Sequence, residues 1–303
     1  MVELTMGWVL TRLGKYGEAS DVYNRLRQRA DAPEFIRNRA NLLGARVVAA
    51  QGYAEQALAE LDKLAEKRAW QVLALDAKIR TLLRAGREEE ADLSLARLRE
   101  IAEEAKDSDV LRRVAEVHLL ANRTKEALAL CDQVEALSPD DARSYLLRAA
   151  ILAGAGRGGE VPAVLEKVLE IQPGNLKTHV ALAKVLDSQQ RPRRALDVLD
   201  RMAKLGWAGR TWAMFERGKW FVRWGLYTQA IECFDQLMGE GHGGIAELQL
   251  SLGQAFVRVG QMDRAHEVLN GIRSYSGQYA PAQQLLARIA GPVAKKLSIC
   301  LCT

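Results

Sequence analysis

One short pattern recurs eight times along the chain and limits the architecture that the chain can adopt. In each copy a turn residue is followed within a few positions by an anchor residue, and a large apolar residue comes four positions after the anchor. The anchors are Ala19, Ala57, Ala91, Ala127, Val161, Ala195, Ala230 and Ala265. Successive anchors are 38, 34, 36, 34, 34, 35 and 35 residues apart. Spacing this regular predicts a repeat protein.

Apolar residues around every anchor recur with a period near 3.6 on both sides of the turn residue, which is typical of amphipathic helices. Each unit is therefore expected to be two antiparallel helices joined by a short turn. Composition agrees, because Ala, Leu, Glu and Arg dominate and all four favour helices. The 303 residues need no single large core, since each repeat of a solenoid packs only on its neighbours.

The pattern resembles the tetratricopeptide repeat family, whose members are solenoids of helix pairs. Leu-Gly-type pairs occur at Met6-Gly7 and Leu252-Gly253, and Gly218 matches the glycine. The aromatic and closing places are filled by Tyr16, Tyr227, Pro139 and Pro173. The resemblance implies an all-α, right-handed α-solenoid of about eight helix-pair repeats plus a C-terminal capping helix. Pentatricopeptide and other helical-pair repeats are the nearest alternatives.

The predicted repeats cover residues 1–280, and a capping helix and tail follow at 281–303. The individual units are 1–33, 38–70, 72–106, 108–141, 142–175, 176–209, 211–245 and 246–279. The fifth unit departs most from the pattern, because Val161 replaces the anchor Ala and a GRGGEVP turn comes before it. The anchor and the small residue twelve positions earlier are expected to form the crossing of the two helices. That small residue is Gly7, Ala45, Ala115, Ala149, Ala183, Gly218 or Gly253, and Ile79 is the exception.

The two ends of the array differ. Pro281 suits a first helical turn and Gly291-Pro292 suits a stop, which predicts a closing helix. Met1 falls near the start of the first helix, and no polar cap precedes it. We therefore expect either that the chain is a fragment of a longer protein or that a partner packs on the N-terminal end.

No catalytic or metal-binding constellation is visible. None of the four histidines has a second His at ligand spacing, and we interpret His118 as a packed core residue. Cys131 and Cys233 lie on apolar helix faces and are interpreted as small buried hydrophobic residues. Cys300 and Cys302 are interpreted as a tail. The chain is thus expected to be no enzyme, with no catalytic residues, metal or cofactor.

In tetratricopeptide proteins the first helix of each repeat lines the concave face, where ligands usually lie. The corresponding face here has 48 positions, of which 13 are basic and six acidic, against about seven and six for the chain average. The alternative to a ligand-binding face is that this excess of basic residues arose by chance. The basic residues are Arg12, Arg39, Arg46, Arg80, Arg84, Arg112, Arg113, Arg143, Lys177, Lys184, Lys219, Arg223 and Arg258.

Nine residues are predicted to bind a partner in this groove. They are Arg46, Arg80, Arg84, Arg112, Lys184, Trp212, Phe215, Lys219 and Arg223. An acidic or extended peptide, or a free C-terminal carboxylate, would suit them, because Arg binds carboxylates bidentately. For Trp212 and Phe215, core packing or burial by the next repeat is the slightly favoured alternative, whereas Trp224 and Phe221 occupy core-facing places. The family's chaperone-binding clamp is not expected, since its central Asn residues are missing.

These features favour a protein-interaction scaffold or adaptor. One alternative is an RNA-binding helical repeat, which the basic groove permits, although the groove positions show no base-reading code. Another is the regulatory arm of a larger enzyme. The net charge of +5 is too weak by itself to indicate nucleic-acid binding. No signal peptide or membrane span is recognised in the sequence, so a cytoplasmic location is expected, with the location of a longer protein left open.

Overall fold

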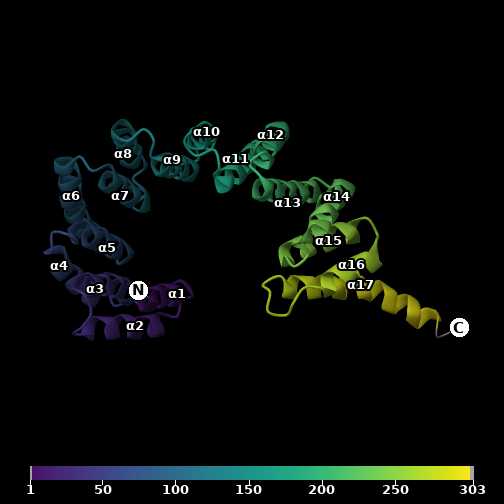
Figure 1. The fold of residues 1–303 in the computed structure, drawn as a ribbon, viewed down its shortest axis with the longest axis horizontal. Coiled ribbons are helices and arrows are strands. Elements are labelled where there is room, and N and C mark those ends of the chain that lie inside the picture. Colours follow the sequence, from purple (N-terminus) through teal and green to yellow (C-terminus); the bar gives the residue numbers. More distant parts are fainter. Residues whose placement is uncertain (1, 301–303) are drawn as a thin grey trace. The chain divides into compact units, whose positions relative to one another are not determined.

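The computed structural model describes the backbone of residues 2–300 and the side chains of residues 2–289. Within the described backbone the chain is helical, without strands, and forms a helical-repeat solenoid (Figure 1). The helices are α1 Val2–Arg12, α2 Tyr16–Gln28, α3 Glu34–Ala50, α4 Ala54–Ala65, α5 Gln71–Arg84, α6 Glu88–Ala105, α7 Ser108–Leu120, α8 Thr124–Leu137, α9 Ala142–Gly154, α10 Val161–Ile171, α11 Leu176–Ser188, α12 Pro192–Ala203, α13 Trp207–Arg223, α14 Tyr227–Leu237, α15 Ala246–Arg258, α16 Met262–Asn270 and α17 Tyr279–Cys300.

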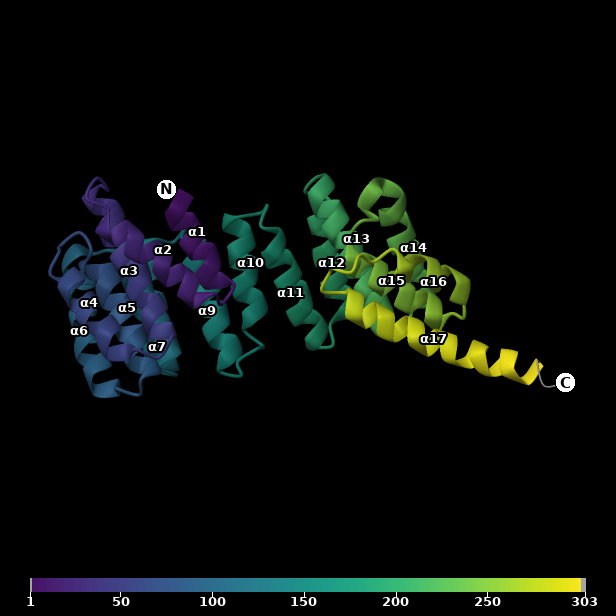
Figure 2. The same cartoon turned by 90° about the horizontal axis from the view of Figure 1, so that it is seen from below.

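The chain divides into two compact units, Met1–Glu160 and Val161–Thr303. The division falls inside the segment 142–175 that the sequence predicts as the fifth repeat. In the first unit the odd-numbered helices α3, α5, α7 and α9 lie along one side and α4, α6 and α8 along the other (Figure 1). In the second unit α17 lies alongside α15 and α16, which it contacts (Figure 2). Each helix thus packs mainly on its neighbours in sequence, as in a solenoid.

The anchor residues are buried throughout the chain. All eight are at most 3% exposed, from Ala19 at 0% to Val161 at 3%. The large apolar residues four positions later are buried as well. They are Tyr23, Leu61, Leu95, Cys131, Leu165, Leu199, Phe234 and Leu269. The predicted core of the repeat is therefore confirmed.

The turn residues adopt the backbone conformation that such a tight connection needs. All eight have positive φ, which reverses the chain between the two helices. Six are glycines, and the other two are Asn122 (φ 57°) and Gln190 (φ 60°). Glutamine pays a steric cost in this left-handed region that glycine avoids.

The crossing of the paired helices differs in one respect from the expectation. The small residue on the first helix lies against the residue four positions after the anchor. A Cβ on Gly7 would lie 2.7 Å from the Tyr23 ring, and a Cβ on Gly253 would lie 2.6 Å from Leu269 Cγ. The reason is that the longer side chain, one turn further along the second helix, reaches across to the gap that the glycine leaves.

Helix ends follow the sequence signals except at the C-terminus. As predicted, α8 and α10 end before Pro139 and Pro173. The expected stop at Gly291-Pro292 is wrong, because α17 continues to Cys300. A single proline removes one N–H donor but fixes φ near a helical value, so it does not by itself end a helix. Between α14 and α15 the chain forms a short π-helical turn, η1 Met238–His242, which Gly241 interrupts with a positive φ of 92°.

Candidate functional site

A ladder of ion pairs runs across the odd-numbered helices of the first unit. Arg80 on α5 donates from Nε to Asp76 (2.9 Å) and from Nη2 to Glu116 on α7 (3.0 Å). Arg112 donates to the other oxygen of Glu116 (2.6 Å), and Asp109 then links Arg112 to Arg143 on α9. Two of the predicted partner-binding residues, Arg80 and Arg112, therefore have their charge balanced inside the protein.

Four other arginines on the same helices have no such balance. We call Arg39, Arg46, Arg84 and Arg113 the unit 1 arginine surface. Among the described residues, none of these four makes a hydrogen bond or an ion pair with a carboxylate. They come from α3, α5 and α7, and α3 contacts α5, which in turn contacts α7. Arg46 and Arg84 were predicted as binding residues, whereas Arg39 and Arg113 were only members of the basic face.

Arg46 lies at the electrostatic centre of this surface. Although Arg46 is exposed to solvent, partial burial of its side chain lowers its pKa below the ordinary value. Asp76 acts in the opposite direction, whereas Arg80, Arg84 and Arg113 lower the pKa further. An arginine whose charged form is opposed by its surroundings gains from a nearby negative charge. Arg46 therefore lies in a locally positive part of the first unit.

Three cations of the second unit that were predicted to bind a partner, Lys184, Lys219 and Arg223, are paired with acids. Lys219 on α13 is held by Glu247 (2.8 Å) and Glu216 (3.4 Å), and Lys184 lies 3.9 Å from Glu216. Arg223 donates to Asp187 (2.5 Å). Helical neighbours and adjacent first helices supply these acids. A count of basic residues along the sequence could not show which of them would be neutralised.

The aromatic residues of α13 separate into core and surface. Phe215 packs at 6.1 Å from the Phe234 ring, with the Lys219 ammonium 5.1 Å above it, so it belongs partly to the core. Trp212 is 44% exposed and remains a surface residue. Trp220 is wholly buried, and the sequence did not single it out. Phe221 packs on the core as expected.

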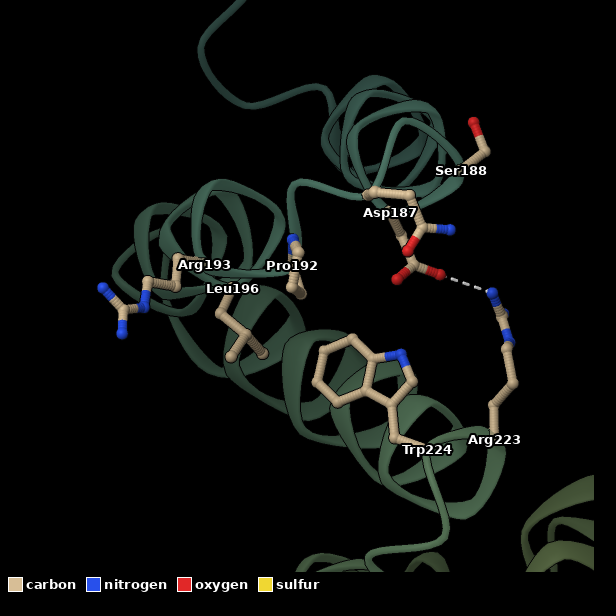
Figure 3. A pocket seen from close by; sticks show the side chains of 8 residues that line it. Asp187, Ser188, Pro192, Arg193, Leu196, Arg223 and Trp224 are labelled. Atoms are coloured by element: carbon tan, nitrogen blue, oxygen red, sulfur yellow. Dashed lines mark hydrogen bonds and ion pairs between the residues drawn. The ribbon is translucent and has the colours of Figure 1, made fainter.

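Trp224, expected at a core-facing place, is only partly buried. Its ring packs 6.0 Å from that of Trp220 and lines a cavity of about 690 Å³ at the ends of α11 and α13. In Figure 3 the indole points into this space, with the Asp187–Arg223 ion pair on one side and Pro192 and Leu196 on the other. The tryptophan is less buried than expected because it follows directly on the last residue of α13, where fewer neighbours cover it.

An exposed apolar stripe runs along one side of α1 and includes the residue that follows it. Val2, Met6, Val9 and Leu13 are spaced as on one helix face, and they are 83%, 52%, 42% and 67% exposed. Val2 and Val9 stand 17 and 10 positions before their anchor. In the next unit the same places hold Ala40 and Val47, and both are fully buried against α2 and its neighbours. The stripe therefore occupies the face that later repeats use to pack on the preceding repeat.

The histidine and cysteine side chains that could take part in chemistry mostly pack against other residues. His118 is buried, and burial lowers its pKa. Burial raises the pKa of the Cys131 thiol to about 11, whereas Cys233 is only partly buried, less than expected. The interpretation of Cys300 and Cys302 concerns side chains outside the described residues. Within residues 2–289 no cluster of three His, Cys, Asp or Glu could hold a metal ion, and no described helix is long and apolar enough to span a bilayer.

No protein-family model matches the chain, and no curated protein matches its sequence. Solved structures with a similar fold include YrrB, a tetratricopeptide protein described as having an unusual peptide-binding site. It shares 22% identity, and the match covers 62% of this chain and 97% of YrrB with a TM-score of 0.43. MamA shares 16% identity over 54% of this chain and 88% of its own, with the same TM-score.

A tetratricopeptide repeat protein from Parabacteroides merdae matches over more of the chain. Its identity is 13%, and the match covers 84% of this chain and 97% of that protein with a TM-score of 0.43. The helices and their contacts make the chain an α-helical repeat solenoid. The solved structures to which it is similar include tetratricopeptide-repeat proteins.

Proposed function

We propose that this protein is an interaction scaffold whose first unit binds an acidic, extended segment of a partner protein on the unit 1 arginine surface. The observation that carries the proposal is the environment of Arg46. Three arginines act on its charge, and Asp76, the acid that acts on it most strongly, is already hydrogen-bonded to Arg80. A bound carboxylate would relieve this repulsion and accept charge-assisted hydrogen bonds.

The spread of the four arginines favours an extended ligand over a single anion. Neighbouring packed helices are separated by about 10 Å, so α3 and α7 lie roughly 20 Å apart. An extended chain advances about 3.3 Å per residue, so about six residues would cross from Arg39 and Arg46 to Arg113. The Arg80–Glu116–Arg112 ladder between them links α5 to α7 and would give the ligand a rigid surface to lie on.

Binding of labelled peptides tests the proposal directly. We would measure fluorescence anisotropy with an eight-residue peptide rich in Asp and Glu, with the same peptide carrying Asn and Gln instead, and with an RNA octamer. The acidic peptide should bind, and its affinity should fall with salt because exposed charges are screened. Exchanging Arg46 and Arg84 for Gln should weaken binding at least tenfold. The matched control is Arg97→Gln, an exposed arginine on α6.

The outcomes separate the candidate functions. Loss of binding in the Arg46/Arg84 variant but not in the Arg97 variant supports an acidic segment as the ligand. Preference for the RNA octamer would replace the proposal by the RNA-binding alternative. Equal binding of the acidic and the amide peptide would also overturn it, because charge would then not be what the surface recognises.

We further propose that the open stripe on α1 packs against an amphipathic helix of a partner. The stripe stands in register with residues that are buried between successive repeats, where the second helix of the preceding pair covers them. A helix with apolar residues three and four positions apart, like α8, has the matching surface. Charged or irregular segments do not, because they would leave Val2, Met6 and Val9 exposed.

A grafted helix tests this second surface. Fusing a copy of residues 123–142, which hold α8 and its connector, ahead of Met1 places a second helix before α1 at the natural spacing. We expect a rise in Tm and a loss of hydrophobic-dye binding. A matched graft with Lys in place of Leu130 and Val134, two of the four buried residues of α8, should give neither. Identical Tm values for the two grafts would refute the proposed packing.

A further inference from the structure

The second unit holds a pocket of about 750 Å³ whose lining combines an aliphatic wall with basic side chains. Its residues come from α13 to α17 and are Val222, Tyr227, Gln254, Val257, Arg258, Met262, Leu285, Arg288 and Ile289. The volume is within the range of small-molecule sites, about 300–1,000 Å³. We call it the Arg258–Arg288 pocket.

The polar groups of this pocket share one property, which is that each can donate a hydrogen bond. Arg258 and Arg288 supply two guanidinium groups, Tyr227 a phenol and Gln254 an amide. No acid is among the described lining residues. Within residues 2–289, neither arginine forms an ion pair, unlike Arg223 and Lys219 in the same unit, which are both neutralised. The polar side of the pocket therefore complements an anion.

The apolar side complements an aliphatic chain. Val257, Leu285 and Ile289 extend the core cluster of the second unit, and Met262 is 40% exposed at the rim. Methionine adapts to ligands of different shape because its side chain is unbranched. Burying an aliphatic chain here would cover these side chains and contribute about 25 cal/mol per Å² of apolar area.

We propose that the Arg258–Arg288 pocket binds a carboxylate carried on an aliphatic chain. The carboxylate accepts hydrogen bonds from Arg258 and Arg288, and the chain lies against Val257, Leu285 and Ile289. Such a group can come from a free aliphatic acid or from the last residue of a peptide that ends in Leu or Ile. The site is separate from the unit 1 arginine surface, so either can exist without the other.

Calorimetric titration of the full chain tests the head group and the chain separately. Decanoate, kept below its micelle concentration, should bind, whereas decanol and acetate should not. In a second arm, a short peptide that ends in Leu with a free carboxylate is compared with its amide. Binding of decanoate or of the free-acid peptide over its uncharged counterpart supports the site and identifies the source of the carboxylate.

Single-residue variants test whether the ligand binds in the pocket. Arg258→Gln and Arg288→Gln should each weaken the preferred ligand at least tenfold, because each removes a charge-assisted hydrogen bond. Arg273→Gln is the matched control, an exposed arginine outside the pocket whose Nη1 donates to Tyr275. Unchanged Tm values verify that the variants fold. Equal binding of decanol and decanoate, no binding of either acid, or equal loss in the Arg273 variant would overturn the proposal.

Discussion

The ring of Phe234 fills the space that a side chain on Gly218 would need. A Cβ on Gly218 would lie 2.7 Å from Phe234 Cζ, too close for any real contact. Gly7 and Tyr23 repeat this relationship in the first unit of the chain. Both aromatic residues at this place thus face a glycine, whereas the repeats that hold Leu61 and Leu199 have an alanine, Ala45 or Ala183, in place of the glycine. The volume of the crossing differs between repeats, since Gly253 faces the smaller Leu269.

Gly218→Ala should therefore destabilise the second unit by about 1–3 kcal/mol, because the methyl group forces the Phe234 ring to move. Phe234→Leu alone should also destabilise, through a cavity. The double variant recreates the Ala–Leu pair of other repeats and should be more stable than the sum of the two changes predicts. Urea unfolding of the four proteins measures this coupling. Additive effects would show that the two residues do not compete for the same space.

Gln190 has a strained, left-handed backbone conformation, and at this position most of the other turns have glycine. Its φ is 60°, so Gln190→Gly should stabilise the chain by up to about 1 kcal/mol, seen as a higher Tm. The matched reverse change is Gly225→Ala, where φ is 76° and no atom lies within 4 Å of the added Cβ. It should lower Tm through the backbone alone. A destabilising Gln190→Gly change would mean that the glutamine side chain contributes more than the strain costs.

His118 should make the first unit sensitive to acid. Its pKa is lowered from 6.5, chiefly by burial and then by Arg123, and its Nδ1 atom is buried without a hydrogen-bond partner. The unfolded chain therefore binds the proton more readily. Stability is complete above about pH 6.5 and is lost as the pH falls from there toward the lower folded pKa. His118→Leu should remove this part of the acid sensitivity, measured as Tm between pH 7.5 and 5.5.

His266→Leu, a partly exposed histidine on α16, is the control for that measurement. It should leave the Tm profile unchanged. If the His118 variant loses as much stability in acid as the parent protein, protonation of another group is responsible.

Most of the fold could be predicted from the sequence because the same pattern of anchor, apolar and turn residues occurs eight times. The anchors, the apolar residues after them and the turn residues all behave as predicted, since each depends on neighbours within one helix pair. The groove was harder to predict. Arg80 and Arg46 occupy similar places in the sequence pattern. Of these two, only Arg80 is paired with Glu116. That pairing depends on which acid the adjacent helix presents, 36 residues away, so the periodicity of one helix could not reveal it.

Glu116 should for this reason control how strongly the unit 1 arginine surface attracts an anion. Its two oxygens accept from Arg80 and Arg112, so Glu116→Gln removes one negative charge and leaves Arg80 with Asp76 and Arg112 with Asp109 and Asp141 as their remaining acids. The affinity for the acidic octapeptide should rise about threefold or more at low salt, and less at high salt. Tm should fall slightly, because partly exposed ion pairs contribute about 0–1 kcal/mol.

The control for Glu116 is Glu100→Gln, which removes the same charge from the Arg97 pair on α6. Net charge changes equally in the two variants, so a general electrostatic effect would raise the affinity of both for the peptide. A rise confined to the Glu116 variant locates the ligand beside Arg80 and Arg112. If the Glu116 variant binds the peptide no better than the parent, the acidic segment does not lie over the ladder, and the assignment of the unit 1 arginine surface fails.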